Sequence, residues 1–317
     1  MKHIKNIFIF ILCLISFSSC LIFSSCDFRP ENNKKSIVCT IFPEYDWVRE
    51  IIKGNENNFS LTCLTGNGED MHSYQATVKD IAEIASADIF ICVGGESDEW
   101  TQKALANSRN KNLRVINLLD ILGDYVKEEE IKEGMQGEQE EGEADEHVWL
   151  SLENAKIFIQ EIANEIVAID GYNSALYLSN AQSYIDKLDE LNNKFKSVVE
   201  AGSKNTLVFA DRFPFRYFVD DYNLNYYAAF SGCSAESEAS FETIIFLSNK
   251  VSSLNLNVIL VIEGSKTNLA QTVRKNTTTK NQEILVFNSM QSVKLKGDSS
   301  YLSIMEQNLE ILKKALA

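Results

Sequence analysis

Short apolar runs alternate with helical patterns along the first half of the chain. The apolar runs are SIVCTIF from Ser36, then FSLTCLT, IFICVGG and LRVINLL. Each has the length of an interior strand and is apolar along nearly all of it. The segments between them, PEYDWVREIIKGN, VKDIAEIASA and SDEWTQKALAN, have helical spacing of apolar residues. Strands of this kind separated by helices predict a parallel sheet that is covered on both faces.

A second series with the same alternation begins after Asn205. Its predicted strands are NTLVFA, NYYAAF, VILVIE and EILVFN, and its predicted helices are PFRYFVDDY, SFETIIFLSNKVSSL, NLAQTVRK and a terminal helix from about Ser299. A long helical stretch, broken near Gly171, lies between the two series. The pattern predicts an α/β fold with two lobes, each a mostly parallel sheet flanked by helices, joined by a long linker helix.

The chain length agrees with two lobes. Beyond its first residues the chain has about 290 residues, more than one small core usually takes. We place the N-terminal lobe at residues 36–170, the linker helix at 171–203 and the C-terminal lobe at 204–317.

The N-terminus has the pattern of an export signal. Lys2 and Lys5 precede the apolar run Ile7 to Ile15, and small residues and cysteine follow. The sequence FSSC occurs twice, ending at Cys20 and at Cys26, and a small-residue pair before cysteine suits lipoprotein processing.

We therefore predict a lipoprotein signal peptide at residues 1–25, lipidation of Cys26, and a polar tether at 26–35. Processing at Cys20 is an alternative, and so is an uncleaved anchor from Ile7 to Phe23, which barely reaches the roughly 20 residues of a membrane span. Each alternative places the domain outside the cytoplasmic membrane and attached to it.

The charge of the chain is strongly negative. A formal net charge of −15 argues against a nucleic acid partner, which would need clustered basic residues, and fits a cation ligand better. More than half of this excess lies in Lys127 to Glu146, where ten acidic residues accompany two lysines. This acidic segment, residues 127–146, has few apolar residues, so we expect a mobile loop.

Four cysteines lie beyond the predicted leader: Cys39, Cys63, Cys92 and Cys233. Their spacing is irregular, no CxxC pair occurs, and the first three fall within apolar runs. We favour buried small hydrophobic residues over a metal or redox role, with a single disulfide as an alternative.

Histidine is scarce, which makes its positions informative. Of the three histidines, His3 lies in the predicted leader, whereas His72 and His147 occur in the polar settings DMHSY and DEHVW. Each follows a predicted strand through a loop, and neutral imidazole in such a place is a ligand for divalent metals. The alternative for each histidine alone is a residue at a helix terminus.

Three more polar residues end predicted strands in the second series: Asp211, Glu263 and Asn288. Because ligands bind at the carboxyl ends of parallel strands, two facing lobes would bring these residues and both histidines to one cleft. We therefore predict a metal site made by His72, His147, Asp211 and Glu263, with Asn288 as a weaker candidate. Two imidazoles with carboxylates suit Zn²⁺ first and Mn²⁺ second. For Asp211 the alternative is a salt bridge to a neighbouring arginine.

Two motifs resemble those of a known family. DMHSYQATVKD is similar to the first-histidine motif, and DEHVWLSLENA to the second-histidine motif, of the zinc- and manganese-binding solute-binding lipoproteins of bacterial ABC importers, with Glu146 where the family has proline. GGESDEW, DRFPFRYFVDDYNL, ESEASFETI and VILVIEG resemble further landmarks of this family in the expected order. The resemblance covers nearly all of the chain beyond the leader.

The resemblance implies a lipid-anchored, extracytoplasmic receptor that captures a divalent metal between two lobes and delivers it to an ABC permease. In many members a His or Glu before a Tyr-Phe pair is the third ligand, but ADRFPFRYF offers Asp211 or Arg212. The fourth ligand is often an Asp near the last strand, where FNSMQ provides Asn288. Glu263 matches an acidic position of the family, either as a ligand or as a residue that orients one.

Two other classes of function are compatible with the residues. A zinc-dependent hydrolase would use two histidines, a carboxylate and a water, but the sequence has no HExxH motif and no second metal cluster. A surface adhesin could use the same fold. We favour a monomeric binding protein that is not an enzyme and binds no nucleic acid.

Overall fold

The first sheet contains the four strands that the apolar runs predict. The computed structural model describes residues 34–137, 143–234, 238–295, 297 and 299–317. Its first strands are β1 (Lys35–Cys39), β2 (Phe59–Cys63), β3 (Ile89–Cys92) and β4 (Arg114–Asn117). They pair in the order β2-β1-β3-β4, and every pair is parallel. The predicted leader 1–25, which contains Cys20, and the tether from Cys26 as far as residue 33 lie outside the described residues.

The second sheet repeats this arrangement. Its strands are β5 (Thr206–Phe213), β6 (Asn225–Ser231), β7 (Val258–Val261) and β8 (Glu283–Val286), in the parallel order β6-β5-β7-β8. Every residue of β3 and of β7 is buried, as a strand between two helical layers requires. The predicted α/β class with two parallel sheets is confirmed.

The shorter helices follow the strands as expected. They are α2 (Phe42–Ile51), α3 (Val78–Ser86), α4 (Trp100–Ala106), α5 (Leu118–Leu122), α8 (Arg216–Asp221), α9 (Phe241–Ser253), α10 (Asn268–Asn276) and α11 (Tyr301–Ala315). Single 3₁₀ turns occur at η2 (Glu56–Asn58), η3 (Met71–Ser73), η4 (Gly123–Tyr125), η5 (Val148–Leu150) and η6 (Gly171–Asn173).

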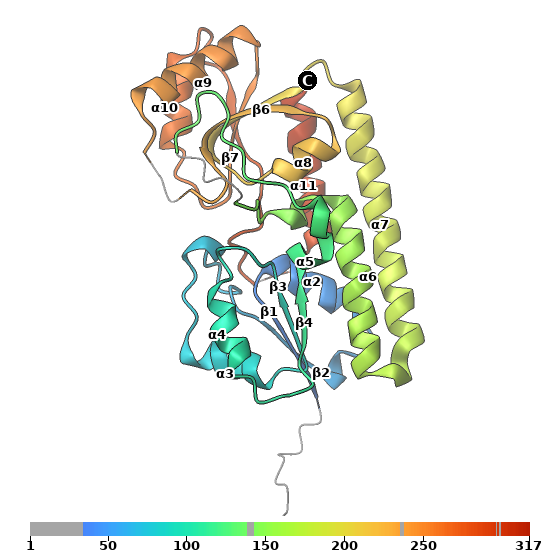
Figure 1. The fold of residues 1–317 in the computed structure, drawn as a ribbon. Helices are drawn as coiled ribbons and strands as arrows, with labels where there is room; N and C mark the ends of the chain where they lie inside the picture. Colours follow the sequence, from blue (N-terminus) through green and yellow to red (C-terminus); the bar gives the residue numbers. More distant parts are fainter. Residues whose placement is uncertain (1–33, 138–142, 235–237, 296, 298) are drawn as a thin grey trace, which may run out of the picture. The chain divides into compact units, whose positions relative to one another are not determined.

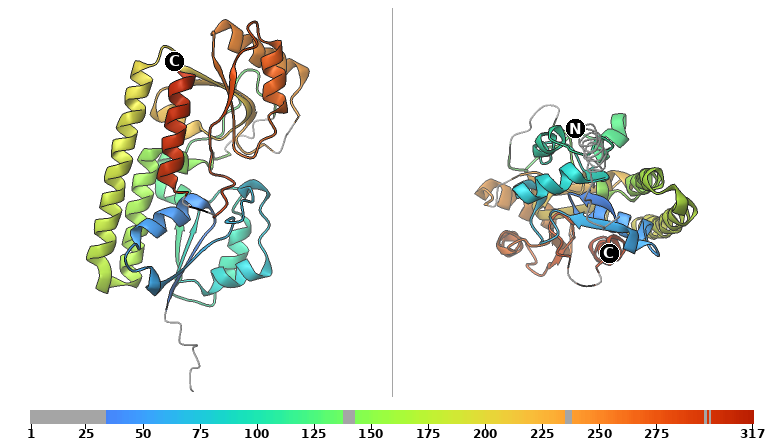
Figure 2. Two further views of the ribbon diagram at one scale, coloured as in Figure 1. Left: turned by 180° about the vertical axis from the view of Figure 1, so that it is seen from behind. Right: turned by 90° about the horizontal axis from the view of Figure 1, so that it is seen from below.

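Two long helices follow the last strand of the first sheet and precede the first strand of the second sheet in the sequence. They lie side by side (Figure 1). They are α6 (Leu152–Ile169) and α7 (Ser174–Ala201), which has 28 residues, and η6 separates them at the predicted break near Gly171. Figure 2 shows α11 beside α7, and α7 also packs against α2 from the first half. The helix pair therefore contacts elements of both halves, whereas the lobe boundaries 36–170, 171–203 and 204–317 stay predictions. No helix in the described part of the chain has the length and apolar character to cross a bilayer.

A buried carboxylate ties α2 to the end of the chain. Asp46 on α2 accepts a hydrogen bond from the backbone N–H of Tyr301 at 2.8 Å and from the Tyr184 hydroxyl at 3.4 Å, and it forms an ion pair with Arg49. Tyr301 begins α11 and Tyr184 belongs to α7. A wide opening between the halves would have to break these contacts.

The acidic segment 127–146 differs from its prediction. Residues 138–142 lie outside the described part, but the preceding residues pack on the second sheet instead of forming a mobile loop. The backbone N–H of Gln136 donates to the carbonyl of Ala229 at 2.9 Å, and Gln136 forms an isolated bridge with Phe230. The Glu130 carboxylate accepts from the Tyr226 hydroxyl at 3.2 Å. Pairing of Gln136 with the edge of β6, and the hydrogen bond from Tyr226 of β6, hold residues 130–136 in place although few apolar residues are present.

The segment after β8 returns to the first half. Asn67 and Lys294 form an antiparallel bridge, and the Leu295 N–H donates to the Gly66 carbonyl at 2.9 Å. The Trp149 indole N–H donates to the Ser289 carbonyl at 2.8 Å. These contacts hold residues 289–295 against the loops that carry both histidines.

One buried carboxyl group makes stability depend on pH. Glu44 is fully buried and accepts from the backbone N–H of Thr40 at 2.8 Å and of Ile41 at 3.3 Å. Burial, and then the charge of Asp98, raise its pKa from the ordinary 4.5 to about 8. The folded protein therefore holds a proton on Glu44 over a range in which the unfolded chain has released it.

We predict that the free energy of unfolding falls as the pH rises from about 4.5 to 8, because the folded state binds more protons across this window. Glu44→Gln should remove this contribution, which is on the order of a few kcal/mol. Urea unfolding of both proteins at pH 5 and pH 8 measures the difference, with Glu306→Gln on the exposed side of α11 as a control. Identical pH slopes for Glu44→Gln and the unsubstituted protein would contradict the assignment.

Candidate metal centre

His72 lies in the 3₁₀ turn η3, between β2 and α3. Asp70 precedes this turn and accepts a hydrogen bond from the His72 backbone N–H at 3.1 Å. The same carboxylate forms an ion pair with Arg212 of β5. The loop that carries His72 is therefore held both by its own cap and by a residue of the second half.

His147 is fixed by the start of the long helix. It immediately precedes η5, and Ser151 caps α6 by accepting from the Asn154 N–H at 3.1 Å. The His147 N–H donates to the Asp145 carboxylate at 2.9 Å. Trp149, two residues further on, is fully buried and anchors the turn. His147 is itself completely buried.

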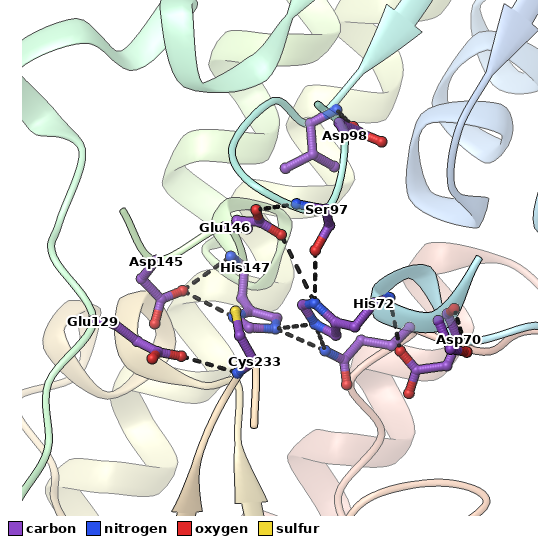
Figure 3. Close-up of polar contacts among 12 residues, drawn as sticks. Asp70, His72, Ser97, Asp98, Glu129, Asp145, Glu146, His147 and Cys233 are labelled. Carbon is purple, nitrogen blue, oxygen red and sulfur yellow. Dashed lines mark hydrogen bonds and ion pairs between the residues drawn. The ribbon is translucent and has the colours of Figure 1, made fainter. Parts of the chain in front are cut away.

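The two imidazoles face each other through their Nε2 atoms, which are 3.2 Å apart (Figure 3). His147 Nδ1 lies 3.0 Å from the Asp145 carboxylate, so this nitrogen carries the ring proton. His72 Nδ1 lies 2.8 Å from the Ser97 hydroxyl and 3.9 Å from the Glu146 carboxylate. Outer partners of this kind hold the ring orientation and leave Nε2 for a metal.

Cys233 joins this pair from the second half of the molecule. Its sulfur and one nitrogen from each histidine all lie within 4.8 Å of one another. The Cys233 N–H donates to the Glu129 carboxylate of the acidic segment at 2.9 Å. A Cβ on Gly232 would lie 2.6 Å from Cε1 of His147, so only glycine lets the chain pass this close to the ring.

The sequence interpretation did not anticipate a site role for Cys233. The four described cysteines are all free, so the alternative of a disulfide between them is not observed. Cys39 and Cys92 are buried, as expected of small hydrophobic residues, whereas Cys233 is only partly buried and sits beside two imidazoles. Its place directly after β6 was the available signal, because β6 ends at the same edge as the other site strands.

Gln291 is a second residue that sequence reasoning missed. Its side-chain amide nitrogen lies 2.7 Å from Nε2 of His72 and 2.7 Å from Nε2 of His147. Met290, just before it, adopts a left-handed backbone with φ 61°, a conformation that costs energy for a side chain of this type. This turn directs Gln291 toward the histidines.

Glu263 positions Gln291 and is not grouped with the histidines. Its carboxylate accepts from the Ser289 N–H at 2.7 Å and from the Gln291 N–H at 2.9 Å. The Ser289 hydroxyl lies 2.9 Å and 3.0 Å from the two oxygens of that carboxylate. It also lies 3.0 Å from the side-chain amide oxygen of Gln291. The carboxylate thus fixes the backbone of the segment that carries Gln291.

Asp211 and Asn288 also make backbone contacts. The Asp211 carboxylate accepts from its neighbour Arg212 N–H at 2.9 Å and from the Ile262 N–H at 3.0 Å, which links β5 to the end of β7. Arg212 forms its ion pair with Asp70, so the salt bridge considered between Asp211 and Arg212 does not form. The Asn288 side chain accepts from the Met290 N–H at 2.9 Å. The structure therefore groups His72 and His147 with Cys233 and brings neither Asp211 nor Asn288 into that group.

Burial shifts the pKa of three groups at the site, each toward its neutral form. Burial, and then the charge of His147, lower the pKa of His72 to about 3. Burial, and then Glu129, raise the pKa of the Cys233 thiol. Burial also raises the pKa of Glu146, one of whose oxygens has no hydrogen bond to any described residue. A neutral imidazole is ready to bind a metal, whereas the thiol must release its proton on binding.

A cleft opens from this centre between the two halves. It has a volume of about 1020 Å³, and Asp70, His72, Asp211, Cys233 and Glu263 are among its lining residues. The His72 side chain is 11% exposed, whereas His147 is 0% exposed, so solvent reaches the pair from the His72 side. Of the residues predicted to share one cleft, His72, Asp211 and Glu263 line this one, whereas His147 and Asn288 are not among its lining residues.

Comparison with known proteins assigns the family. The model of the zinc-uptake complex component A, a periplasmic protein, matches residues 37–315. The chain belongs to this family. A curated family member, the zinc-binding lipoprotein AdcA of Streptococcus pneumoniae, is 28% identical over 289 residues, which are 90% of this chain and 56% of AdcA. The chain therefore spans about half the length of this relative.

Three further comparisons cover most of the length of the matched chain. The high-affinity zinc uptake protein ZnuA of Bacillus subtilis is 26% identical over 90% of this chain and 89% of its own. The crystal structure of the Zn(II)-bound ZnuA-like domain of AdcA has a TM-score of 0.71 and 26% identity, covering 89% of this chain and 99% of that one. A Mn-bound periplasmic metal-binding protein from Candidatus Liberibacter asiaticus, with a TM-score of 0.73 and 24% identity over 90% of this chain and 100% of that one, shares the fold.

We predict that Gly232→Ala lowers the free energy of unfolding by about 1–3 kcal/mol, because the added methyl overlaps the His147 ring and the carbonyl of Phe213. Gly171→Ala is the matched control, since a Cβ there meets nothing within 4 Å. Thermal and urea unfolding measure both variants. Equal stability of the two would show that the close approach of Gly232 to His147 is incorrect.

Proposed function

We propose that this family member binds a divalent transition-metal ion at His72 and His147 and delivers it to the permease of an ABC importer. The observation that carries the proposal is the pair of Nε2 atoms 3.2 Å apart, each with its Nδ1 engaged by an outer partner. Two imidazoles fixed in this way bind a metal without rearrangement of their rings. The family assignment supplies the transport role.

Zinc is the proposed cargo, with manganese second. Nitrogen ligands give transition metals preference over magnesium and calcium. AdcA and ZnuA, named for zinc, are the similar curated proteins, while the Mn-bound relative supports the fold alone. Asp211 and Glu263 are proposed as positioning residues, because their carboxylates already bind backbone N–H groups at the site edge.

Small movements accompany metal capture in this proposal. The contacts of Asp46 with α7 and α11, together with the packing of α7 against α2 and α11, resist a wide hinge. Loop segments around His72 and Gln291 are the parts that respond. The family assignment, to the zinc-uptake component, favours a binding protein over a hydrolase.

The proposed location is outside the cytoplasmic membrane, through a lipid on Cys26. The two FSSC sequences support this proposal. We predict that Cys26→Ser moves the protein from the membrane fraction to the soluble extracytoplasmic fraction, because it removes the site of acylation, whereas Cys20→Ser leaves it on the membrane. Fractionation and mass spectrometry of the N-terminal peptide measure this. Membrane retention of Cys26→Ser would rule out that cysteine as the anchor.

For metal capture, we predict that the double variant His72→Ala and His147→Ala loses stoichiometric zinc binding. Zinc affinity should fall by more than the roughly 10–100-fold decrease that follows removal of a residue that only hydrogen-bonds to a metal ligand, because both nitrogen ligands disappear. Calorimetric titration of metal-stripped protein measures stoichiometry and affinity.

The matched control is the double variant Gln160→Ala and Asn164→Ala, which removes two exposed side chains from α6 and should bind zinc normally. One equivalent of zinc bound by the histidine variant with unchanged affinity would refute the proposed site.

A further inference from the structure

We propose that the Cys233 thiolate and the Gln291 side-chain carbonyl complete a four-donor site with His72 and His147, and that this donor set selects zinc over manganese. The proposal rests on the metal capture proposed above and names the cargo that the same site prefers. It assigns ligand roles to two residues that contribute from the second half of the molecule, one after β6 and one after β8.

The histidine pair needs a positive partner between its rings. Two unprotonated Nε2 atoms at 3.2 Å present lone pairs to each other, which is unfavourable in a buried place. The Gln291 amide nitrogen lies 2.7 Å from both and has two hydrogens, so it can donate one to each ring. The Gln291 amide therefore satisfies both ring nitrogens.

The same amide can reverse when a metal enters. In the orientation described here the side-chain carbonyl oxygen of Gln291 faces the Ser289 hydroxyl, whose single hydrogen is shared among that oxygen and both Glu263 oxygens. Rotation of the amide by half a turn places its NH₂ against Ser289, which then accepts from Gln291 and donates to Glu263. Rotation thus satisfies the hydroxyl network and directs the carbonyl oxygen to the ion.

Cys233 supplies the remaining donor. Its sulfur lies within 4.8 Å of one ring nitrogen of each histidine, and the hydrogen bond from the Cys233 N–H to Glu129 and the closeness of Gly232 to His147 hold it there. A tetrahedral zinc with Zn–N of about 2.0–2.1 Å and Zn–S of about 2.3 Å places two nitrogens about 3.3 Å apart and nitrogen and sulfur about 3.6 Å apart. The histidine pair already has the spacing of two zinc ligands, and the Cys233 side chain moves toward the ion to complete the site.

This donor set determines the preference among metals. Thiolate is a soft ligand that favours zinc, whereas manganese favours carboxylate and water oxygens. Asp211 and Glu263, the carboxylates that could serve manganese, are held by backbone N–H groups. A site with one thiolate, two imidazoles and one neutral oxygen is therefore suited to zinc and poorly suited to manganese.

The test uses reduced, metal-stripped full-length protein with Co²⁺ as a spectroscopic probe and with Zn²⁺ and Mn²⁺ in separate titrations. The variants are Cys233→Ser, Gln291→Leu and the control Cys63→Ser, which removes a thiol outside the grouped residues. We expect a near-ultraviolet sulfur-to-cobalt charge-transfer band in the unsubstituted protein, in Cys63→Ser and in Gln291→Leu, but not in Cys233→Ser.

We also expect zinc affinity to fall by at least about tenfold in Cys233→Ser and in Gln291→Leu, with less than about threefold change for manganese in Cys233→Ser. A cobalt complex of the unsubstituted protein without the charge-transfer band would overturn the inference, and so would unchanged zinc affinity in Cys233→Ser. Both results would leave metal capture by the histidines intact. Failure of the unsubstituted protein to bind either metal would overturn the proposed function itself.

Discussion

Two buried imidazole nitrogens that face each other at 3.2 Å impose a constraint on everything around them. Such a pair is stable only while a hydrogen-bond donor or a cation lies between the rings. Both rings come from the first half, fixed through Ser97 and Asp145. The groups that can complete the set come from the second half, so the site exists only because the two halves are held together. This explains why so much of the chain outside the site serves to fix their relative position.

The elements that hold the halves together act at three places. The α6–α7 pair contacts both halves, and Asp46 links α2 to α7 and α11. The segment after β8 forms a bridge to the loop after β2, and Asp70 forms an ion pair with Arg212 directly beside His72. The acidic segment adds a fourth link, because Glu129 binds the backbone of Cys233. Its carboxylates therefore take part in site geometry as well as contributing negative charge near a cation site.

Much of the fold could be predicted because it follows from repeated local patterns. Continuous apolar runs such as those of β3 and β7 have few interpretations other than interior strands, and the helical segments between them fix a parallel arrangement. The histidines were identified from their scarcity and their polar settings after strands. Cys233 and Gln291 were missed because they lie in irregular turns, where a positive φ at Met290 or a close approach by Gly232 decides the direction of a side chain. The contact of Gln136 with β6 was missed because it joins residues that are distant in sequence.

Asp211 and Glu263 show a limit of the strand-end rule. The rule placed them correctly along the cleft, yet each carboxylate binds backbone N–H groups that the strand ends leave without partners. A crystal structure of the zinc-loaded protein with anomalous scattering measured at the zinc edge tests the central claim most directly. The account predicts one ion bonded to Nε2 of His72 and of His147, with the Cys233 sulfur and the Gln291 carbonyl oxygen as its other ligands. An ion bound elsewhere, or one bound by Asp211 and Glu263 without either histidine, would contradict it.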